Sequence, residues 1–82
     1  MKARIFVTLK DGVLDPQGQA IQGALGALGF EGVASVRQGK VFDIELANGS
    51  DDDEARLKDM CERLLANTVI EDYRVEVDQG RV

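Results

Sequence analysis

Apolar and polar side chains alternate along residues 3–9. This period of two is typical of a strand with one buried face, because successive side chains of a strand point to opposite faces of the sheet. The polar residues and glycine that follow are expected to end the strand. One face of this strand is formed by Ala3, Ile5, Val7 and Leu9, and the other by Arg4, Phe6 and Thr8.

A helix is expected to begin after Asp15 and to end before Gly29. Asp15 suits the N-cap, and Pro16 suits the first helical position, where its missing N–H costs nothing. Gly29 suits the left-handed residue that closes a Schellman motif, in which Phe30 would contact Leu25. The apolar stripe that should face the core comprises Ile21, Ala24, Leu25 and Leu28.

Two further strands are predicted after this helix. One lies within residues 32–37, and the other spans residues 41–47. The short turn formed by Gln38, Gly39 and Lys40 would join them into a hairpin. Apolar residues alternate again on the later strand, and its core face holds Phe42, Ile44 and Leu46.

A second helix and a last strand complete the pattern. Ser50 can cap this helix, the acidic residues 51–54 lie at the positive end of its dipole, and Asn67 suits a left-handed end. The last strand lies within residues 69–77. The core-facing residues are Leu57, Met60, Cys61, Leu64 and Leu65 on the helix and Tyr73, Val75 and Val77 on the strand.

This β-α-β-β-α-β order predicts the α+β class and a ferredoxin-like fold. A four-stranded antiparallel sheet would carry two helices on one face, in a single domain of residues 1–82 whose tail, residues 78–82, frays. Arginines and acids would be neighbours on the helix-free face, so cross-strand ion pairs are expected there. That face is either a solvated surface or a polar subunit interface. It would hold Arg4, Phe6, Thr8, Val41, Asp43, Glu45, Arg74 and Glu76.

The charge balance argues against nucleic acid as a partner. Ten basic and fifteen acidic residues give the 82-residue chain a net charge of −5, and the basic residues are scattered, whereas nucleic-acid binding needs a basic patch. No stretch approaches the about 20 apolar residues of a membrane span, and residues 1–9 lack the apolar block of a signal peptide. A single cysteine makes a reducing compartment the simpler assumption. We therefore expect a soluble cytoplasmic protein, with neither nucleic acid nor a membrane as partner.

Residues suited to catalysis are scarce. The chain contains no histidine, which removes the commonest general base and metal ligand and excludes a Cys–His pair. Cys61 falls on the apolar stripe, where a buried core residue is far commoner than a nucleophile. The acidic run at residues 51–54 is better explained by a helix dipole than by a magnesium or calcium site. We expect no catalytic, cofactor-binding or metal-binding residue.

The strongest functional indication is the absence of charge from residues 16–30, although 30% of the chain is charged. On the helix face opposite the apolar stripe lie Gln19, Gly23 and Gly26. Each glycine inside a helix costs about 1 kcal/mol relative to alanine. Such a face suits close packing against another protein, and the alternative is indifference to helix stability in a small domain. Val13 and Leu14 precede the helix. A hydrophobic staple would pair Leu14 with an apolar residue at N4, but N4 is Gln19, so these two residues lack a local partner.

Blocks of residues in a fixed order also match one family. They are Lys10, Gly12-Val13-Leu14-Asp15-Pro16-Gln17-Gly18, Leu28-Gly29-Phe30, Val36-Arg37-Gln38-Gly39-Lys40, Cys61-Glu62-Arg63-Leu64-Leu65-Ala66-Asn67 and Val69-Ile70-Glu71-Asp72-Tyr73. These blocks closely resemble the PurS family, the small subunit of phosphoribosylformylglycinamidine synthase, also called formylglycinamide ribonucleotide amidotransferase. The resemblance extends to Val77. Thr68 departs from it, because such proteins usually have proline there, which would stiffen the turn into the last strand.

The resemblance implies a non-catalytic subunit of a glutamine-dependent carbon–nitrogen ligase in de novo purine biosynthesis. In that family's assembly, a glutaminase subunit (PurQ) releases ammonia, and a large synthetase subunit (PurL) uses ATP to convert formylglycinamide ribonucleotide to the amidine. The small subunit, a dimer or larger homo-oligomer such as a tetramer, bridges the two and supports ammonia transfer. By this resemblance the chain itself binds no cofactor, while the whole complex uses ATP and magnesium.

The expected partner surface combines the first helix with residues from the family blocks. Arg37 and Lys40 have an ordinary alternative as solvated charges, and Tyr73 has one as a core aromatic residue. A different function, that of a ferredoxin-like ligand-sensing regulatory domain, would place an effector at the strand–loop–helix junction of residues 12–18. The expected partner residues are Val13, Leu14, Asp15, Pro16, Gln17, Gly18, Gln19, Gly23, Gly26, Arg37, Lys40, Asn67 and Tyr73.

Overall fold

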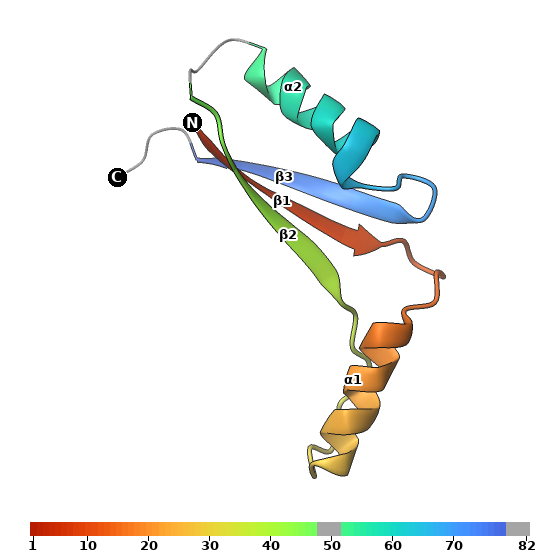
Figure 1. The fold of residues 1–82 in the computed structure, drawn as a ribbon. Helices are drawn as coiled ribbons and strands as arrows, with labels where there is room; N and C mark the ends of the chain where they lie inside the picture. Colours follow the sequence, from red (N-terminus) through yellow and green to blue (C-terminus); the bar gives the residue numbers. More distant parts are fainter. Residues whose placement is uncertain (48–51, 79–82) are drawn as a thin grey trace.

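A computed structural model describes residues 1–47 and 52–78 of the chain. These residues form a three-stranded sheet, two α-helices and one π-helical turn (Figure 1). None of the helices within them is long and apolar enough to span a bilayer. The elements in chain order are β1 (Lys2–Leu9), α1 (Pro16–Ala27), β2 (Gly39–Glu45), α2 (Asp53–Met60), η1 (Cys61–Leu65) and β3 (Glu71–Asp78).

The sheet is antiparallel, and β1 is its central strand in the order β2-β1-β3. Ile5 of β1 lies opposite Phe42 of β2 and Val75 of β3. Because both neighbours run antiparallel to β1, they run parallel to each other. The connection from β2 to β3 must therefore cross the length of the sheet, and α2 lies across one face along this path (Figure 1).

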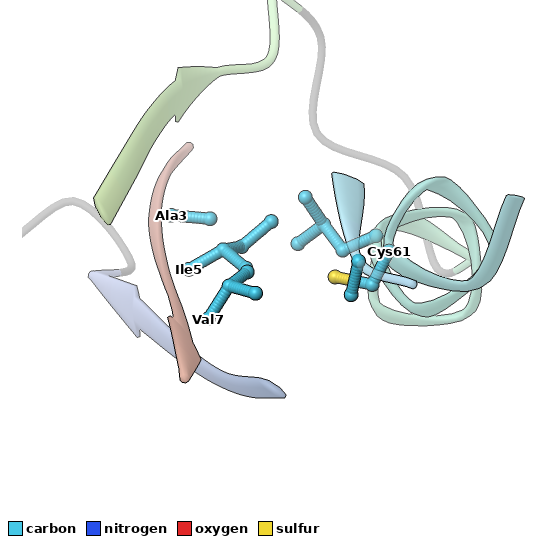
Figure 2. Close-up of a cluster of buried hydrophobic side chains, with 6 residues drawn as sticks. Ala3, Ile5, Val7 and Cys61 are labelled. Carbon is cyan, nitrogen blue, oxygen red and sulfur yellow. The ribbon is translucent and has the colours of Figure 1, made fainter. Parts of the chain in front are cut away.

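The core forms between β1 and the helix that crosses it. Ala3, Ile5 and Val7 point from β1 toward Cys61 (Figure 2), and all four are buried. The alternation predicted for residues 3–9 is confirmed, and so is the core placement of Cys61. Leu57 and Ala66 complete the buried cluster, and partly buried residues pack around it, namely Met1, Phe42, Ile44, Leu46, Met60, Leu65, Tyr73, Val75 and Val77.

A π-helical turn shifts the buried stripe of the second helix. The N–H of Ala66 donates to the carbonyl of Cys61 at 2.9 Å, which is the i→i+5 bond of a π-helix and takes up one more residue than an α-turn. Leu57 and Cys61 are buried, but Leu64 is 83% exposed. The prediction that Leu64 belongs to the buried stripe is therefore wrong, because the phase changes after Cys61.

The second helix also begins and ends differently from the prediction. Its N-cap is Asp52, and Ser50, the predicted cap, lies outside the described residues. Ala66 after the π-turn is extended, and no non-glycine residue in the described ranges has a positive φ. The predicted left-handed Asn67 is therefore wrong. Asn67 instead organises the turn into β3, where its carbonyl accepts from the N–H groups of Ile70 at 3.0 Å and Glu71 at 2.7 Å. Asp78 ends β3, and the rest of the expected tail lies outside the described residues.

Helix α1 has both predicted ends. Asp15 is the N-cap, and its carboxylate accepts from the N–H of Gly18 at 2.9 Å. At the other end, Gly29 has a φ of 94°. Its N–H donates to Gly26 at 3.0 Å, and the N–H of Phe30 donates to Leu25 at 3.0 Å. These two bonds are the Schellman motif that the sequence predicts.

The predicted four-stranded ferredoxin-like sheet is wrong. Residues 31–38 form no strand, and Gly39 and Lys40, predicted as a turn, belong to β2. Residues 31–38, the segment that returns to the sheet, lie along α1 and not along a sheet edge. The Gln22 side chain holds them there by donating to the carbonyls of Val33 and Ala34, each at 3.3 Å. We call residues 16–38 the arm. Figure 1 shows α1 projecting beyond the end of the sheet, and the radius of gyration is 16.3 Å, against about 12 Å for a compact domain of this length.

The buried carboxylate of Asp15 joins α1 to the returning segment. One oxygen caps the helix at Gly18, and the other accepts from the N–H of Gln38 at 2.7 Å. The hydrogen bonds from Gln38 and Gly18 hold the pKa of Asp15 below its ordinary value. The ionised carboxylate is thus part of the folded structure of the arm.

Truncation of core and surface leucines tests the phase of the π-turn. We expect Leu57→Ala to lower the free energy of unfolding by about 2–5 kcal/mol, because it leaves a cavity in the core. Leu64→Ala is the matched control and should change it by about 0.5 kcal/mol or less. Urea unfolding at one protein concentration measures both. Equal losses would contradict the described phase.

The pH dependence of stability tests Asp15. A lowered folded-state pKa stabilises the fold above the unfolded pKa of about 3.9, and this stabilisation is lost as the pH falls through the folded value. Asp15→Asn should therefore be less stable than the parent at pH 7, and the difference should shrink below about pH 4. Urea unfolding from pH 7 to pH 2 measures this. A difference that stays constant over this range would show that the ionised form is not required.

Candidate functional site

Neither a metal cluster nor an accessible thiol is found among the described residues. They contain no group of three metal-ligating side chains. Cys61 is fully buried, and burial, followed by the nearby charge of Glu62, raises the pKa of its thiol. A protonated, inaccessible thiol is not a nucleophile. The functional features of this part of the chain are therefore its surfaces.

The helix-free face of the sheet carries paired charges. Arg4 Nε lies 2.8 Å from Asp43 Oδ1, which confirms the predicted cross-strand ion pair. The Arg74 guanidinium lies 4.4 Å from the centre of the Phe6 ring, a cation–π contact. A half-open hollow of about 590 Å³ on this part of the sheet is lined by both acids and bases. The mixed charges give the hollow no strong field for an anionic nucleotide.

The arm exposes its apolar stripe. Ile21 is 41% exposed, Leu28 74% and Phe30 59%, and Gly18 is the one buried residue of α1. The expectation that this stripe is buried in the core of the same chain is wrong, because α1 projects from the end of the sheet. Leu25 is half-buried, but most of the stripe is an apolar surface that residues 1–47 and 52–78 leave uncovered.

The opposite face of α1 is also open. A Cβ atom at Gly23 or Gly26 would meet nothing within 4 Å. Gln19, Pro16 and Gln17 are exposed as well. No segment of the described chain approaches these glycines, so their close approach to a partner stays a prediction.

Three of the predicted partner residues form contacts within the chain at the base of the arm. The Arg37 guanidinium donates to the carbonyls of Val13, Leu9 and Lys10, and Asp15 is 5% exposed. A Cβ on Gly18 would overlap the carbonyl oxygen of Val36 and lie 2.7 Å from Asp15 Oδ2. Glycine is required here because the helix start and the returning segment pass in contact. Arg37, Asp15 and Gly18 therefore build the base of the arm.

The same contacts argue against an effector site at the predicted junction. The Arg37 side chain and the second oxygen of Asp15 form hydrogen bonds between the segment before β2 and the chain that precedes α1. A small molecule there would have to replace hydrogen bonds that the chain already makes. The ligand-sensing alternative is therefore not favoured.

The remaining predicted residues lie at the end of the sheet from which the arm projects. Lys40 and Tyr73 both lie opposite Val7, one on each neighbouring strand. Lys40 Nζ is 3.7 Å from a carboxylate oxygen of Glu71. The Tyr73 hydroxyl donates to Glu62 at 2.7 Å, and this bond, together with burial, raises the pKa of Tyr73 to about 12. Of the two apolar residues before the helix, Val13 is half-buried and Leu14 is 64% exposed.

The sequence interpretation missed a second group of exposed apolar residues. Leu64 and Val69 are 83% and 81% exposed, and Ile70 is 40% exposed. Val69 and Ile70 lie in the turn before β3. The sequence shows two β-branched apolar residues here, but the prediction placed both in the last strand and so did not recognise them as an exposed turn.

Comparison with known proteins gives a consistent result. The family model PurS, described as phosphoribosylformylglycinamidine (FGAM) synthase, matches residues 2–79. The FGAM synthase subunit PurS of Bacillus subtilis is 47% identical over 78 residues, which cover 95% of this chain and 93% of that protein. Its crystal structure has a TM-score of 0.87 and covers 95% of this chain and 98% of that chain.

Two further solved structures extend the likeness. PurS of Methanocaldococcus jannaschii, one of the subunits of formylglycinamide ribonucleotide amidotransferase in the purine biosynthetic pathway, has a TM-score of 0.86 at 40% identity, covering 98% of each chain. A chain in the structure of PurLQS from Thermotoga maritima has a TM-score of 0.80 at 32% identity, covering 92% of this chain and 93% of that chain. With matches over nearly its whole length, the chain belongs to the PurS family of FGAM synthase subunits.

Proposed function

We propose that this chain is the non-catalytic small subunit of a cytoplasmic FGAM synthase, which holds a glutaminase subunit of the PurQ type and an ATP-dependent synthetase of the PurL type together and supports the transfer of ammonia between them. It acts as a dimer or larger homo-oligomer. ATP and magnesium serve the other subunits. The observation that carries the proposal is the uncovered apolar stripe on an arm that projects from the sheet.

The arm receives little packing from the rest of the described chain. It is built on a 12-residue helix with no buried apolar side chain, and isolated helices shorter than about 12–15 residues are marginal in water. Full burial of an exposed side chain of this size contributes about 1.5–3 kcal/mol, and burial of Ile21, Leu28 or Phe30 would each contribute the share that corresponds to its exposed fraction. Contact with another chain would supply the packing that the sheet does not supply.

The two faces of α1 suit different contacts. The apolar stripe suits self-association, because permanent interfaces between copies are the more hydrophobic class. The uncharged face with Gly23 and Gly26 suits close approach by a different subunit, because no side chain stands between the helix backbone and a partner. One helix could thus join a copy of the chain on one side and a larger subunit on the other.

The proposed role requires the chain to position two other subunits and does not require it to react. Ammonia made at one subunit and consumed at another must be kept from solvent, where it is diluted and protonated. A small subunit can favour this by holding the two larger subunits in one geometry, in the way that proximity favours any second step over escape. The fully buried Cys61 thiol and the absence of histidine accord with such a passive role.

A charge on the apolar stripe should disrupt self-association. Leu28→Asp replaces a residue that is 74% exposed, so the isolated fold should survive while burial of the stripe becomes unfavourable. Ala20→Asp adds the same charge to the same helix away from the stripe and serves as the control. Light scattering after size-exclusion chromatography measures the mass. An unchanged mass for Leu28→Asp would rule out the stripe as the self-association surface.

Large side chains on the glycine face should uncouple the complex. Gly23→Arg combined with Gly26→Glu fits the isolated chain, because each Cβ would lie in open space, and loss of two helical glycines should not weaken the helix. In the reconstituted enzyme we expect loss of glutamine-dependent synthesis, while synthesis from added ammonium salt remains. Normal glutamine-dependent activity of the double variant would exclude this face as a contact.

A further inference from the structure

Three segments meet at the base of the arm through two side chains. The Arg37 guanidinium donates through Nη1 to Val13 at 3.0 Å and through Nη2 to Leu9 at 3.3 Å and Lys10 at 3.1 Å. It therefore ties the segment before β2 to the end of β1 and to the loop that follows. Asp15 ties the start of α1 to the same segment through Gly18 and Gln38.

We propose that Arg37 and Asp15 are positioning residues, which set the direction of the arm relative to the sheet and so preorganise the arm for assembly. This inference rests on the proposed function, in which the arm is an assembly contact. It replaces the expectation that both residues touch a partner directly. Their polar groups are already engaged within the chain, and Asp15 is buried.

Little else holds the arm in place. Gly18 is the one buried residue of α1. The arm is connected to the sheet by residues 10–15 on one side and directly, at Gly39 of β2, on the other. Residues 10–15 include Gly12, whose φ of 85° lies in a region that glycine enters freely. Besides the hydrogen bonds of Arg37 and Asp15, one backbone bond within residues 10–15 restrains the first connection, from the N–H of Val13 to the carbonyl of Lys10 at 3.1 Å. Loss of the side-chain bonds would therefore leave few restraints on the torsion angles at the base of the arm.

Because the arm is long, a small change in its angle to the sheet moves its tip a long way. A helix of 12 residues is about 18 Å long at about 1.5 Å per residue. A rotation of about 10° at the base would move its tip by about 3 Å, by the same rise per residue. A displacement of this size would misplace Leu28 and Phe30 relative to any surface that binds them.

The chemistry of the two side chains suits this role. A planar guanidinium presents several N–H donors in a fixed geometry, whereas a lysine ammonium is a compact charge on a flexible stem. Arg37 can therefore span carbonyls from two segments where lysine would not. Asp15 uses one oxygen for each of its two bonds. Asparagine has a single acceptor oxygen, so it could keep either the helix cap or the link to Gln38.

The first measurement concerns the direction of the arm and is independent of the glutaminase and synthetase subunits. Spin labels at Gly23→Cys in α1 and Glu45→Cys in β2 report the distance between arm and sheet by pulsed electron paramagnetic resonance. Dilution with excess unlabelled chain removes distances between copies. The native Cys61 is fully buried, and a labelling reaction on the parent chain checks that it stays unmodified.

The second measurement concerns assembly. The small subunit is titrated into fixed amounts of glutaminase and synthetase subunits, and the concentration that gives half-maximal glutamine-dependent activity is recorded. Arg37→Ala should broaden the distance distribution and raise this concentration by at least about tenfold, because a mobile arm must be ordered on binding. Arg37→Lys should show smaller changes in both.

The control and the outcomes separate this inference from the proposed function. Arg63→Ala removes the same charge from a side chain that is 78% exposed and outside the arm, and should change neither measurement. An unchanged distance distribution in a folded Arg37→Ala or Asp15→Asn variant would overturn the inference. A broadened distribution with unchanged assembly would overturn it as well, while leaving the proposed function intact. The proposed function itself fails if the parent chain has no effect on glutamine-dependent activity.

Discussion

The antiparallel pairing of β1 with β2 decides the shape of the molecule. Thr8 lies opposite Gly39, so β1 ends where β2 begins, at one end of the sheet. The intervening residues must leave from that end and return to it, and a helix on such a path is not required to cross the sheet. The path from β2 to β3 joins opposite ends, since Lys2 lies opposite Glu45 and Leu9 lies opposite Glu71. Helix α2 must therefore cross the sheet, and α1 becomes an arm.

This constraint separates stability from contact. The buried hydrophobic residues belong to β1 and to the α2–η1 segment with Ala66, and they form a core to which α1 contributes no side chain. The arm carries Ile21, Leu28 and Phe30 with large exposed fractions. A change on the stripe should therefore affect assembly before it affects the fold of the sheet. Small subunits of complexes benefit from this arrangement, because the contact surface can be shaped without disturbing the core.

Local signals were enough to predict the ends of α1 and the faces of β1. The cap of Asp15 and the Schellman motif at Gly29 each depend on a few neighbouring residues, whose chemistry is visible in the sequence. The role of residues 32–37 was not visible in this way. An extended segment satisfies the same alternation whether its neighbour is a strand or a helix, and here Gln22 supplies the hydrogen bonds. Register between distant strands sets which neighbour is present, and no local pattern reports it.

The sequence indicated which segment is unusual, but not the roles of the individual residues at its base. The lack of charge in residues 16–30 directed attention to the arm, where the structure leaves Ile21, Leu28 and Phe30 exposed. That a partner covers this surface stays a prediction. The individual residues at the base of the arm were harder to interpret, because a charged side chain near a loop can bind a partner or the chain's own backbone. Arg37 illustrates this, since its three carbonyl acceptors come from residues more than twenty positions away. Proximity of that kind follows from the topology alone.

The position of the hydrogen bonds explains why a subunit without reactive groups needs a defined structure. A flexible tether could keep two enzymes near each other, but it would leave their relative orientation free. In this chain the bonds of Asp15 and Arg37 hold the sheet and the arm at a fixed angle. Orientation, and not only proximity, is what a transfer between two active sites requires. In the proposed function, the buried carboxylate and the guanidinium at the base of the arm are therefore the polar groups that orient its contact surface.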